Sequence, residues 1–143
     1  MPAKRTVERA KKDLKEGKRP STAAGEFVRE EMEHIRRGRH GGRNPRQAIA
    51  IRLSQARRSG VPLPPPKKGQ ATERTRRSAE AAYEVGQGKR KPRAPSRKRS
   101  RATARALKRE GRVAASPRVL SAQAKRAVAR RKRTKRRPTT RGK

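Results

Sequence analysis

The chain has 143 residues and carries 46 Lys and Arg against 11 Asp and Glu, a formal net charge of +35. This charge opposes compaction and requires a polyanionic partner, and a hydrophobic content of 28% cannot fill one continuous core, so we expect much of the chain to be disordered. The lack of cysteine excludes disulfides and thiolate metal sites, and no segment has the apolar length of a secretory signal or a membrane span.

Residues 1–20 form a basic segment with the pattern of a short helix. Val7, Ala10 and Leu14 fall in helical register, and Gly17 ends the pattern. Acidic residues interrupt the basic ones, which argues against a mitochondrial transit peptide.

Residues 21–60 have the pattern of a helical hairpin and are the part of the chain that the sequence specifies best. In the first helix the acidic side chains precede the basic ones, an order that suits the helix dipole. Either Gly38 or the pair Gly41 and Gly42 offers the end of this helix.

The second helix of the hairpin opens with a capping signal. Asn44 suits the N-cap, Pro45 the first helical position and Gln47 the third, and Gly60 ends the pattern. The apolar alternation over residues 49–53 would also suit a strand, but the capping signal favours a helix. The expected core of the hairpin consists of Ala24, Phe27, Val28, Met32, Ile35, Ile49, Leu53 and Ala56.

The pattern changes twice beyond the hairpin. Residues 61–70 contain four prolines and predict an extended spacer. Residues 71–88 predict a short helix from about Thr72 to Val85, followed by glycines. The expected fold class is therefore mostly α, with a short helical hairpin and largely disordered, helix-permissive basic regions.

Residues 89–143 are expected to form a disordered tail that binds nucleic acid. From residue 85 onwards the chain has 24 basic side chains and one acid, whereas residues 1–84 have 22 basic and 10 acidic side chains. Helix-permissive stretches in the tail would align basic residues along a phosphate strand as helices form on the ligand. The alternative is a solvated tail that only keeps the protein soluble. The candidate nucleic-acid-binding residues are Arg97, Lys98, Arg99, Arg101, Arg105, Lys108, Arg109, Arg126, Arg130, Arg131, Lys132, Arg133, Lys135, Arg136 and Arg137.

Other chemistries have little support in the sequence. Phe27 and Tyr83 are the only aromatic side chains, so we expect no base-stacking platform of the kind that RNA-recognition sheets use. His34 and His40 lie among arginines, which oppose metal binding, and we interpret them as an exposed pair at a helix end. Serines lack a plausible base and no NTPase phosphate loop is present, so we predict no catalysis, no metal and no cofactor.

Two consecutive segments, FVREEMEHIRRGRHG and NPRQAIAIRLSQARRSGVPLPPPKKG, resemble a family of small, strongly basic bacterial proteins. Members carry a domain of unknown function and are sometimes labelled DNA-binding. The resemblance covers about residues 21–69, and SRKRSRATARALKREGR is similar to the rest of the longer members. It implies a bacterial source and supplies no catalytic residues. The tail also resembles linker-histone tails in its Ala, Pro, Ser and basic content, although it favours Arg over Lys.

These features predict a sequence-nonspecific, histone-like DNA-binding protein of the bacterial cytoplasm and nucleoid, which neutralises the charge of phosphate backbones. The hairpin would supply a second DNA contact or self-association, so a homo-oligomer remains open, and no membrane partner is expected. One alternative is an RNA-binding or ribosome-associated protein, because ribosomal extensions share the Arg-rich, aromatic-poor character. Another is a protein-interaction module that the tail anchors.

Overall fold

The computed structural model describes residues 2–136, with side chains up to residue 133. This part of the chain is mostly helical, as the sequence predicted, and contains no β-strand. Its elements are α1 (Lys4–Lys15), α2 (Pro20–Arg36), α3 (Pro45–Arg58), α4 (Glu73–Gly86), α5 (Arg97–Arg109), the short 3₁₀ helix η1 (Val113–Ala115) and α6 (Pro117–Arg136). Among the described helices, none is long and apolar enough to cross a lipid bilayer.

The start of α3 confirms the predicted capping signal. The Asn44 side chain accepts a hydrogen bond from the Gln47 backbone N–H at 2.9 Å, and Pro45 occupies the first helical position. The Gln47 side chain reaches back to the backbone N–H of Arg43 at 3.0 Å, one residue earlier than in the usual capping box. Two of the unpaired donors near this helix start are thereby satisfied.

Glycines in the left-handed conformation end the first four helices. After α2, the Gly38 N–H bonds to the Ile35 carbonyl at 3.1 Å and the Arg39 N–H to the His34 carbonyl at 3.0 Å, the paired bonds of a Schellman motif. Gly38 has a φ of +71°, which a side chain would strain. Gly38 therefore terminates α2, and Gly41 and Gly42 serve another purpose.

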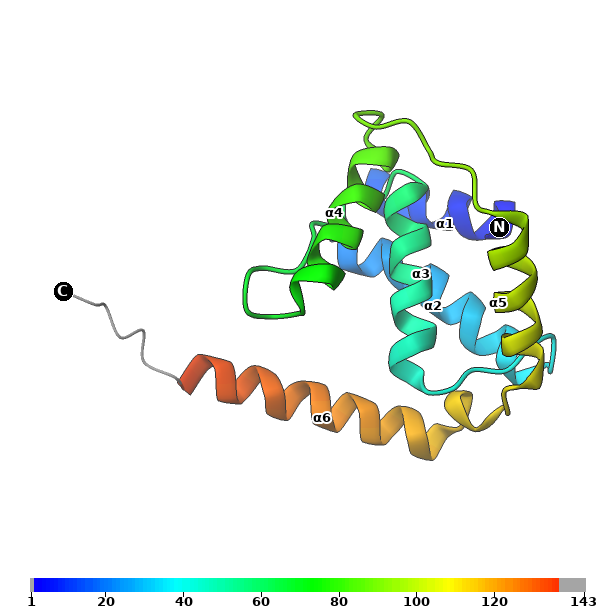
Figure 1. Ribbon diagram of the computed structural model, residues 1–143. Coiled ribbons are helices and arrows are strands. Elements are labelled where there is room, and N and C mark those ends of the chain that lie inside the picture. Colours follow the sequence, from blue (N-terminus) through cyan, green and yellow to red (C-terminus); the bar gives the residue numbers. More distant parts are fainter. Residues whose placement is uncertain (1, 137–143) are drawn as a thin grey trace.

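The helices α1 to α4 pack successively, each on the one before it (Figure 1). One cluster of buried residues joins α1, α2 and the end of α3 around Phe27, and a second lies around Ile35 between α2, α3 and η1. Alanines make up four of the six buried residues of the first cluster and two of the four of the second. The low hydrophobic content is thus divided between two small clusters, in agreement with the expectation that it could not fill one continuous core.

Helices α2 and α3 pack together, but the face of α3 that is most buried differs from the expected seam. Of the expected core, Ala24, Phe27, Met32, Ile35 and Ala56 are buried, whereas Val28, Ile49 and Leu53 are partly buried and pack against the same two clusters. The buried line on α3 runs through Ala48, Arg52 and Ala56. Arg52 takes a core position because its partners lie on α2.

The proline-rich segment is fastened to α3. Val61 is buried in the first cluster and Leu63 packs against it. The Arg57 guanidinium donates to the carbonyls of Leu63 and Pro64, at 3.1 Å in each case. This path leads the chain to α4, whose start at Glu73 confirms the short helix predicted from about Thr72.

The region beyond residue 88 contains two helices in its described part, where the sequence was helix-permissive. None of the residues of α5 is buried. After α5, the chain docks on the loop between α2 and α3: the N–H groups of Gly41 and Gly42 donate to the carbonyls of Leu107 and Gly111, at 2.8 and 3.1 Å. A Cβ at Gly41 would overlap the Glu110 carbonyl, so this close approach needs glycine.

Candidate nucleic-acid interface and a buried polar cluster

Helix α5 presents the first group of candidate binding residues to solvent. The candidates on α5 are all exposed, namely Arg97, Lys98, Arg99, Arg101, Arg105, Lys108 and Arg109. Spacings of three and four residues place Arg97, Arg101, Arg105 and Lys108 along one side of the helix. Lys108 and Arg109 also lie in the last turn of α5, where the helix dipole favours cations.

Helix α6 carries the second group. Arg126, Arg130, Arg131, Lys132 and Arg133 are exposed, and Arg126, Arg130 and Arg133 share one side of the helix. Lys135 and Arg136 lie in the last turn of α6, where the structure describes the backbone. Arg137 lies outside the described residues.

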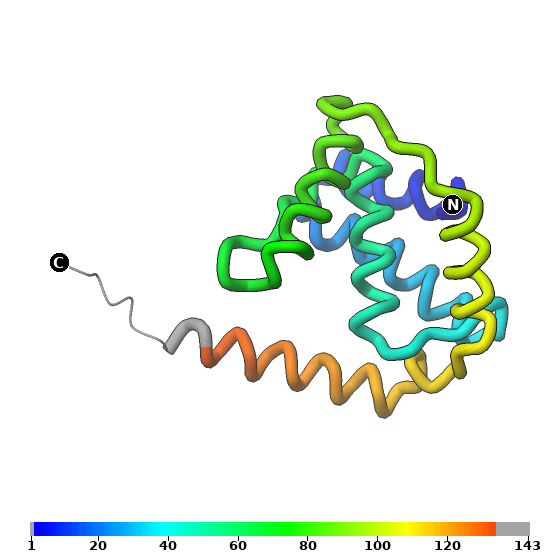
Figure 2. The backbone as a smooth tube through the Cα atoms, viewed as in Figure 1, coloured from blue at the N-terminus to red at the C-terminus, as the bar shows by residue number. Residues whose placement is uncertain are grey.

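The structure does not gather these two groups into one patch. Helices α5 and α6 lead away from η1 in different directions, α5 along one side of the α1–α4 unit and α6 outwards beneath it (Figure 2). The cations therefore form two separate basic surfaces rather than one. Each surface has its own orientation toward solvent.

A groove of about 750 Å³ lies between α6, α3 and the segment before α4. Apolar side chains of α3 and arginines of both helices line it, and no acidic residue is among its lining residues. Arg46 of α3 belongs to this lining and donates to the Gln123 side chain of α6 at 3.3 Å. Sequence reasoning missed Arg46, because its position beside α6 depends on a contact between residues 77 positions apart. The groove is lined by Arg46, Ile49, Ala50, Leu53, Pro66, Gly69, Gln70, Ala71, Thr75, Gln123, Arg126, Ala127, Arg130 and Arg131.

Most acidic residues of the first four helices are engaged with cations of the same unit. Arg76 donates to Glu73 at 2.6 Å, and this hydrogen bond lowers the pKa of Glu73. Arg37 and Glu33 form a similar pair at 2.7 Å. Part of the positive charge of residues 1–84 is thus neutralised internally, and the excess is concentrated on α5 and α6.

A polar cluster lies between α2 and α3 and was not foreseen from the sequence. Arg52 donates from Nε to Glu31 Oε2 at 2.6 Å and from Nη1 to the Gln55 side chain at 2.8 Å. The side chains of Arg52 and Glu31 are only 7% and 3% exposed. Glu30, also buried, accepts from the Ala3 N–H at 3.0 Å through Oε1, while its Oε2 has no hydrogen-bond partner. Two buried carboxylates therefore share one guanidinium.

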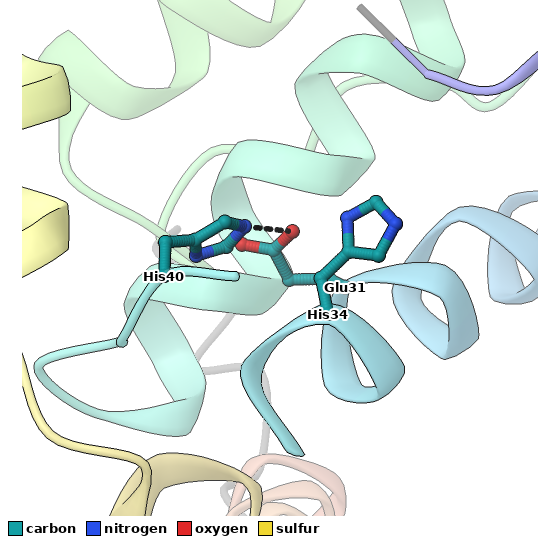
Figure 3. A group of neighbouring side chains, drawn as sticks. All are labelled: Glu31, His34 and His40. Carbon is teal, nitrogen blue, oxygen red and sulfur yellow. Dashed lines mark ion pairs between the residues drawn. The ribbon is translucent and has the colours of Figure 1, made fainter. Parts of the chain in front are cut away.

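His34 and His40 complete this polar cluster (Figure 3). Each is 21% exposed, so the expectation of an exposed pair at the helix end was wrong: His34 lies on α2 beside Glu30, and the loop after α2 brings His40 back to Glu31. The cluster has no sequence signal of its own because Glu30 and Glu31 look like the polar face of an amphipathic helix. Arg52, likewise, looks like a surface residue of α3.

Burial governs the charge of His34. Removal from water lowers the pKa of His34, and the Arg52 and Arg39 charges act in the same direction, against Glu30 and Glu31. His34 is consequently neutral at neutral pH. A neutral imidazole keeps a lone pair on one ring nitrogen.

Comparisons of the chain with family models, with curated proteins and with solved structures found no match. The resemblance of residues 21–69 to a bacterial family remains a prediction.

Proposed function

We propose that this chain is a sequence-nonspecific DNA-binding protein of the bacterial nucleoid, with a histone-like role in neutralising and organising DNA. The observation that carries the proposal is the exposure of the basic residues on α5 and α6, in a half of the chain with 24 basic residues and one acid. Cations displayed in this way bind phosphates by releasing counterions from the duplex. Such contacts carry no direct sequence information.

The arginines favour tight contact with phosphate. Arg outnumbers Lys by 31 to 15, and a guanidinium can donate two parallel hydrogen bonds to one phosphate group. The separate directions of α5 and α6 allow each helix to contact a different duplex. Bridging of two duplexes in this way would compact DNA.

The α1–α4 unit, which contains the hairpin of α2 and α3, acts in this proposal as the folded carrier of the two basic helices. Because α5 buries none of its residues, its helix gains little from packing, and short helices are marginal in water without it. We infer that α5 becomes ordered mainly when phosphates neutralise its charge. Helix content should therefore rise when DNA is added.

A mobility-shift titration over a range of salt concentrations tests the proposal. If about ten phosphates are contacted, the slope of log affinity against log salt is about −9, from ~0.9 per phosphate. Replacement of Arg130, Arg131, Lys132 and Arg133 by Gln should make the slope shallower by up to about 4 and weaken unrelated duplexes equally.

A matched control changes the same charge elsewhere. Replacement of Lys4, Arg5, Lys11 and Lys15 on α1, all exposed, by Gln should leave most of the slope in place. An equal effect of both replacements would remove α6 from the interface. A nearly salt-independent affinity, or a loss confined to one sequence, would reject phosphate-driven binding. Preference for structured RNA over duplex DNA in competition would move the function to RNA binding.

A further inference from the structure

The geometry points to a metal site in the polar cluster: we propose that Glu31, His34 and His40 bind a divalent transition metal of the zinc class, in competition with the Arg52 guanidinium. The ligand atoms of these three residues lie within 4.8 Å of one another. Figure 3 shows the Glu31 carboxylate reaching toward His40, with His34 on the same turn of α2. This inference does not depend on DNA binding.

The hydrogen bond of His40 prepares its other nitrogen for a cation. His40 Nδ1 lies 3.0 Å from the Gly41 carbonyl, which can only accept, so Nδ1 carries the hydrogen. In the neutral ring the lone pair then resides on Nε2, which lies 3.6 Å from Glu31 Oε2. Glu31 Oε2 also accepts from Arg52 Nε at 2.6 Å, so a metal ion held between Oε2 and Nε2 has to compete with the guanidinium. A ring N–H bonded to a backbone carbonyl is also the common support of a metal-binding histidine.

His34 supplies the second nitrogen. A neutral imidazole, with a lone pair on one ring nitrogen, is the form that coordinates a metal. His34 Nδ1 lies 3.4 Å from Arg52 Nη2, and its Nε2 lies 3.2 Å from the exposed Arg39. Coordination at Nδ1 displaces Arg52, whereas coordination at Nε2 displaces only a surface side chain.

The buried charge leaves room for a second cation or for an exchange. With neutral imidazoles, Glu30 and Glu31 carry two negative charges against the single positive charge of Arg52. A divalent ion would balance the two carboxylates by itself, and the 2.8 Å bond to Gln55 can hold the displaced Arg52 guanidinium. Glu30 Oε2, which is buried without a hydrogen-bond partner and lies 3.7 Å from Arg52 Nη1, is available to the incoming charge.

The donor set determines the class of metal. Two imidazole nitrogens and one carboxylate oxygen suit zinc(II) and cobalt(II), while magnesium and calcium prefer oxygen ligands. No thiolate is present, so soft ions such as copper(I) have no advantage here.

The test uses the full chain, purified without a histidine tag and freed of nucleic acid by nuclease and high salt. Zinc chloride is titrated by calorimetry, and cobalt(II) is added to record the visible bands that distinguish tetrahedral from octahedral coordination. One equivalent should bind, and His34→Gln or His40→Gln should weaken binding by at least about tenfold. The matched control Glu33→Gln removes a carboxylate from the exposed face of the same helix and should leave affinity unchanged.

Arg52→Gln gives a result in the opposite direction. It removes the competing cation and retains an amide that can donate to Glu31, so the variant should bind zinc several times more tightly than the parent chain. Circular dichroism with and without zinc reports whether each variant is folded. Absence of zinc binding in both the parent chain and Arg52→Gln overturns the proposal. Binding that both histidine substitutions leave intact overturns it equally.

Discussion

Replacement of Arg52 by Leu should lower the free energy of unfolding by about 3 to 5 kcal/mol, the usual cost of removing one partner from a buried ion pair. The Arg52 side chain is 7% exposed and donates to Glu31 at 2.6 Å, and Glu31 is 3% exposed. Loss of the guanidinium leaves the charges of Glu31 and Glu30 buried without a compensating cation. Leucine fills much of the space between Ala48 and Ala56, so charge rather than volume dominates the change.

A double variant separates the charge effect from packing. Arg52→Leu combined with Glu31→Leu removes both partners, and replacement of a whole buried pair by apolar residues is often close to neutral. The double variant should therefore be more stable than Arg52→Leu alone, with a coupling energy of about 1 to 3 kcal/mol. Urea denaturation followed by far-ultraviolet circular dichroism measures each free energy of unfolding.

Arg37→Leu is the matched control. It breaks a pair of similar length with Glu33, at 2.7 Å, but both side chains are more than half exposed. Exposed pairs contribute less than about 1 kcal/mol, so this change should be small. If Arg52→Leu costs no more than Arg37→Leu, the polar cluster does not hold α2 and α3 together. If the double variant is as unstable as Arg52→Leu, the uncompensated carboxylate is not the cause.

Three further predictions follow from the fold. Gly41→Ala should undock residues 107–111, because the added Cβ overlaps the Glu110 carbonyl, and limited proteolysis should then cleave these residues faster. The control is Gly25→Ala, where a Cβ meets nothing within 4 Å. It should instead raise the free energy of unfolding by about 0.5 to 1 kcal/mol. Deletion of residues 89–143 should remove most of the affinity for duplex DNA in mobility shifts, and near-parental affinity at physiological salt would contradict the assignment of the binding surfaces. Because the folded pKa of His34 is lowered from 6.5, the unfolded state binds more protons below that pH; the free energy of unfolding should fall as the pH drops below about 6.5, and His34→Gln should flatten this part of the urea-denaturation profile.

Local signals in the sequence predicted the helices well. Asn44, Pro45 and Gln47 marked the start of α3, and glycines marked the ends of the first four helices, because capping and turn chemistry depend on neighbouring residues. The basic stretches after residue 96 were recognised as helix-permissive, and the structure shows α5 and α6 there. The proposed ordering of α5 on a ligand depends on charge neutralisation, which local helix propensity does not describe.

Contacts between distant residues could not be read from the sequence. Arg52 lies at a core position because Glu31, 21 residues earlier, is beside it in the fold. Hydrophobic periodicity placed Ile49 and Leu53 in the seam, and it has no means of placing a paired charge there. Counting large apolar residues also underestimates packing in which alanines and glycines let helices approach closely, as at Gly86 of α4, where a Cβ would overlap the Arg57 carbonyl of α3.

The contacts between successive helices have a consequence for synthesis. Helices α1 to α4 each pack on the one made just before, so this unit can assemble in order as it leaves the ribosome. Ten of the eleven acidic residues belong to residues 1–84, and many of them are already engaged with nearby cations when the unit is complete. The strongly cationic half emerges afterwards, when most of these carboxylates are already engaged; Glu84 is an exception and pairs with Arg90 of that half at 3.4 Å. The engaged carboxylates are then poorly placed to bind the new arginines.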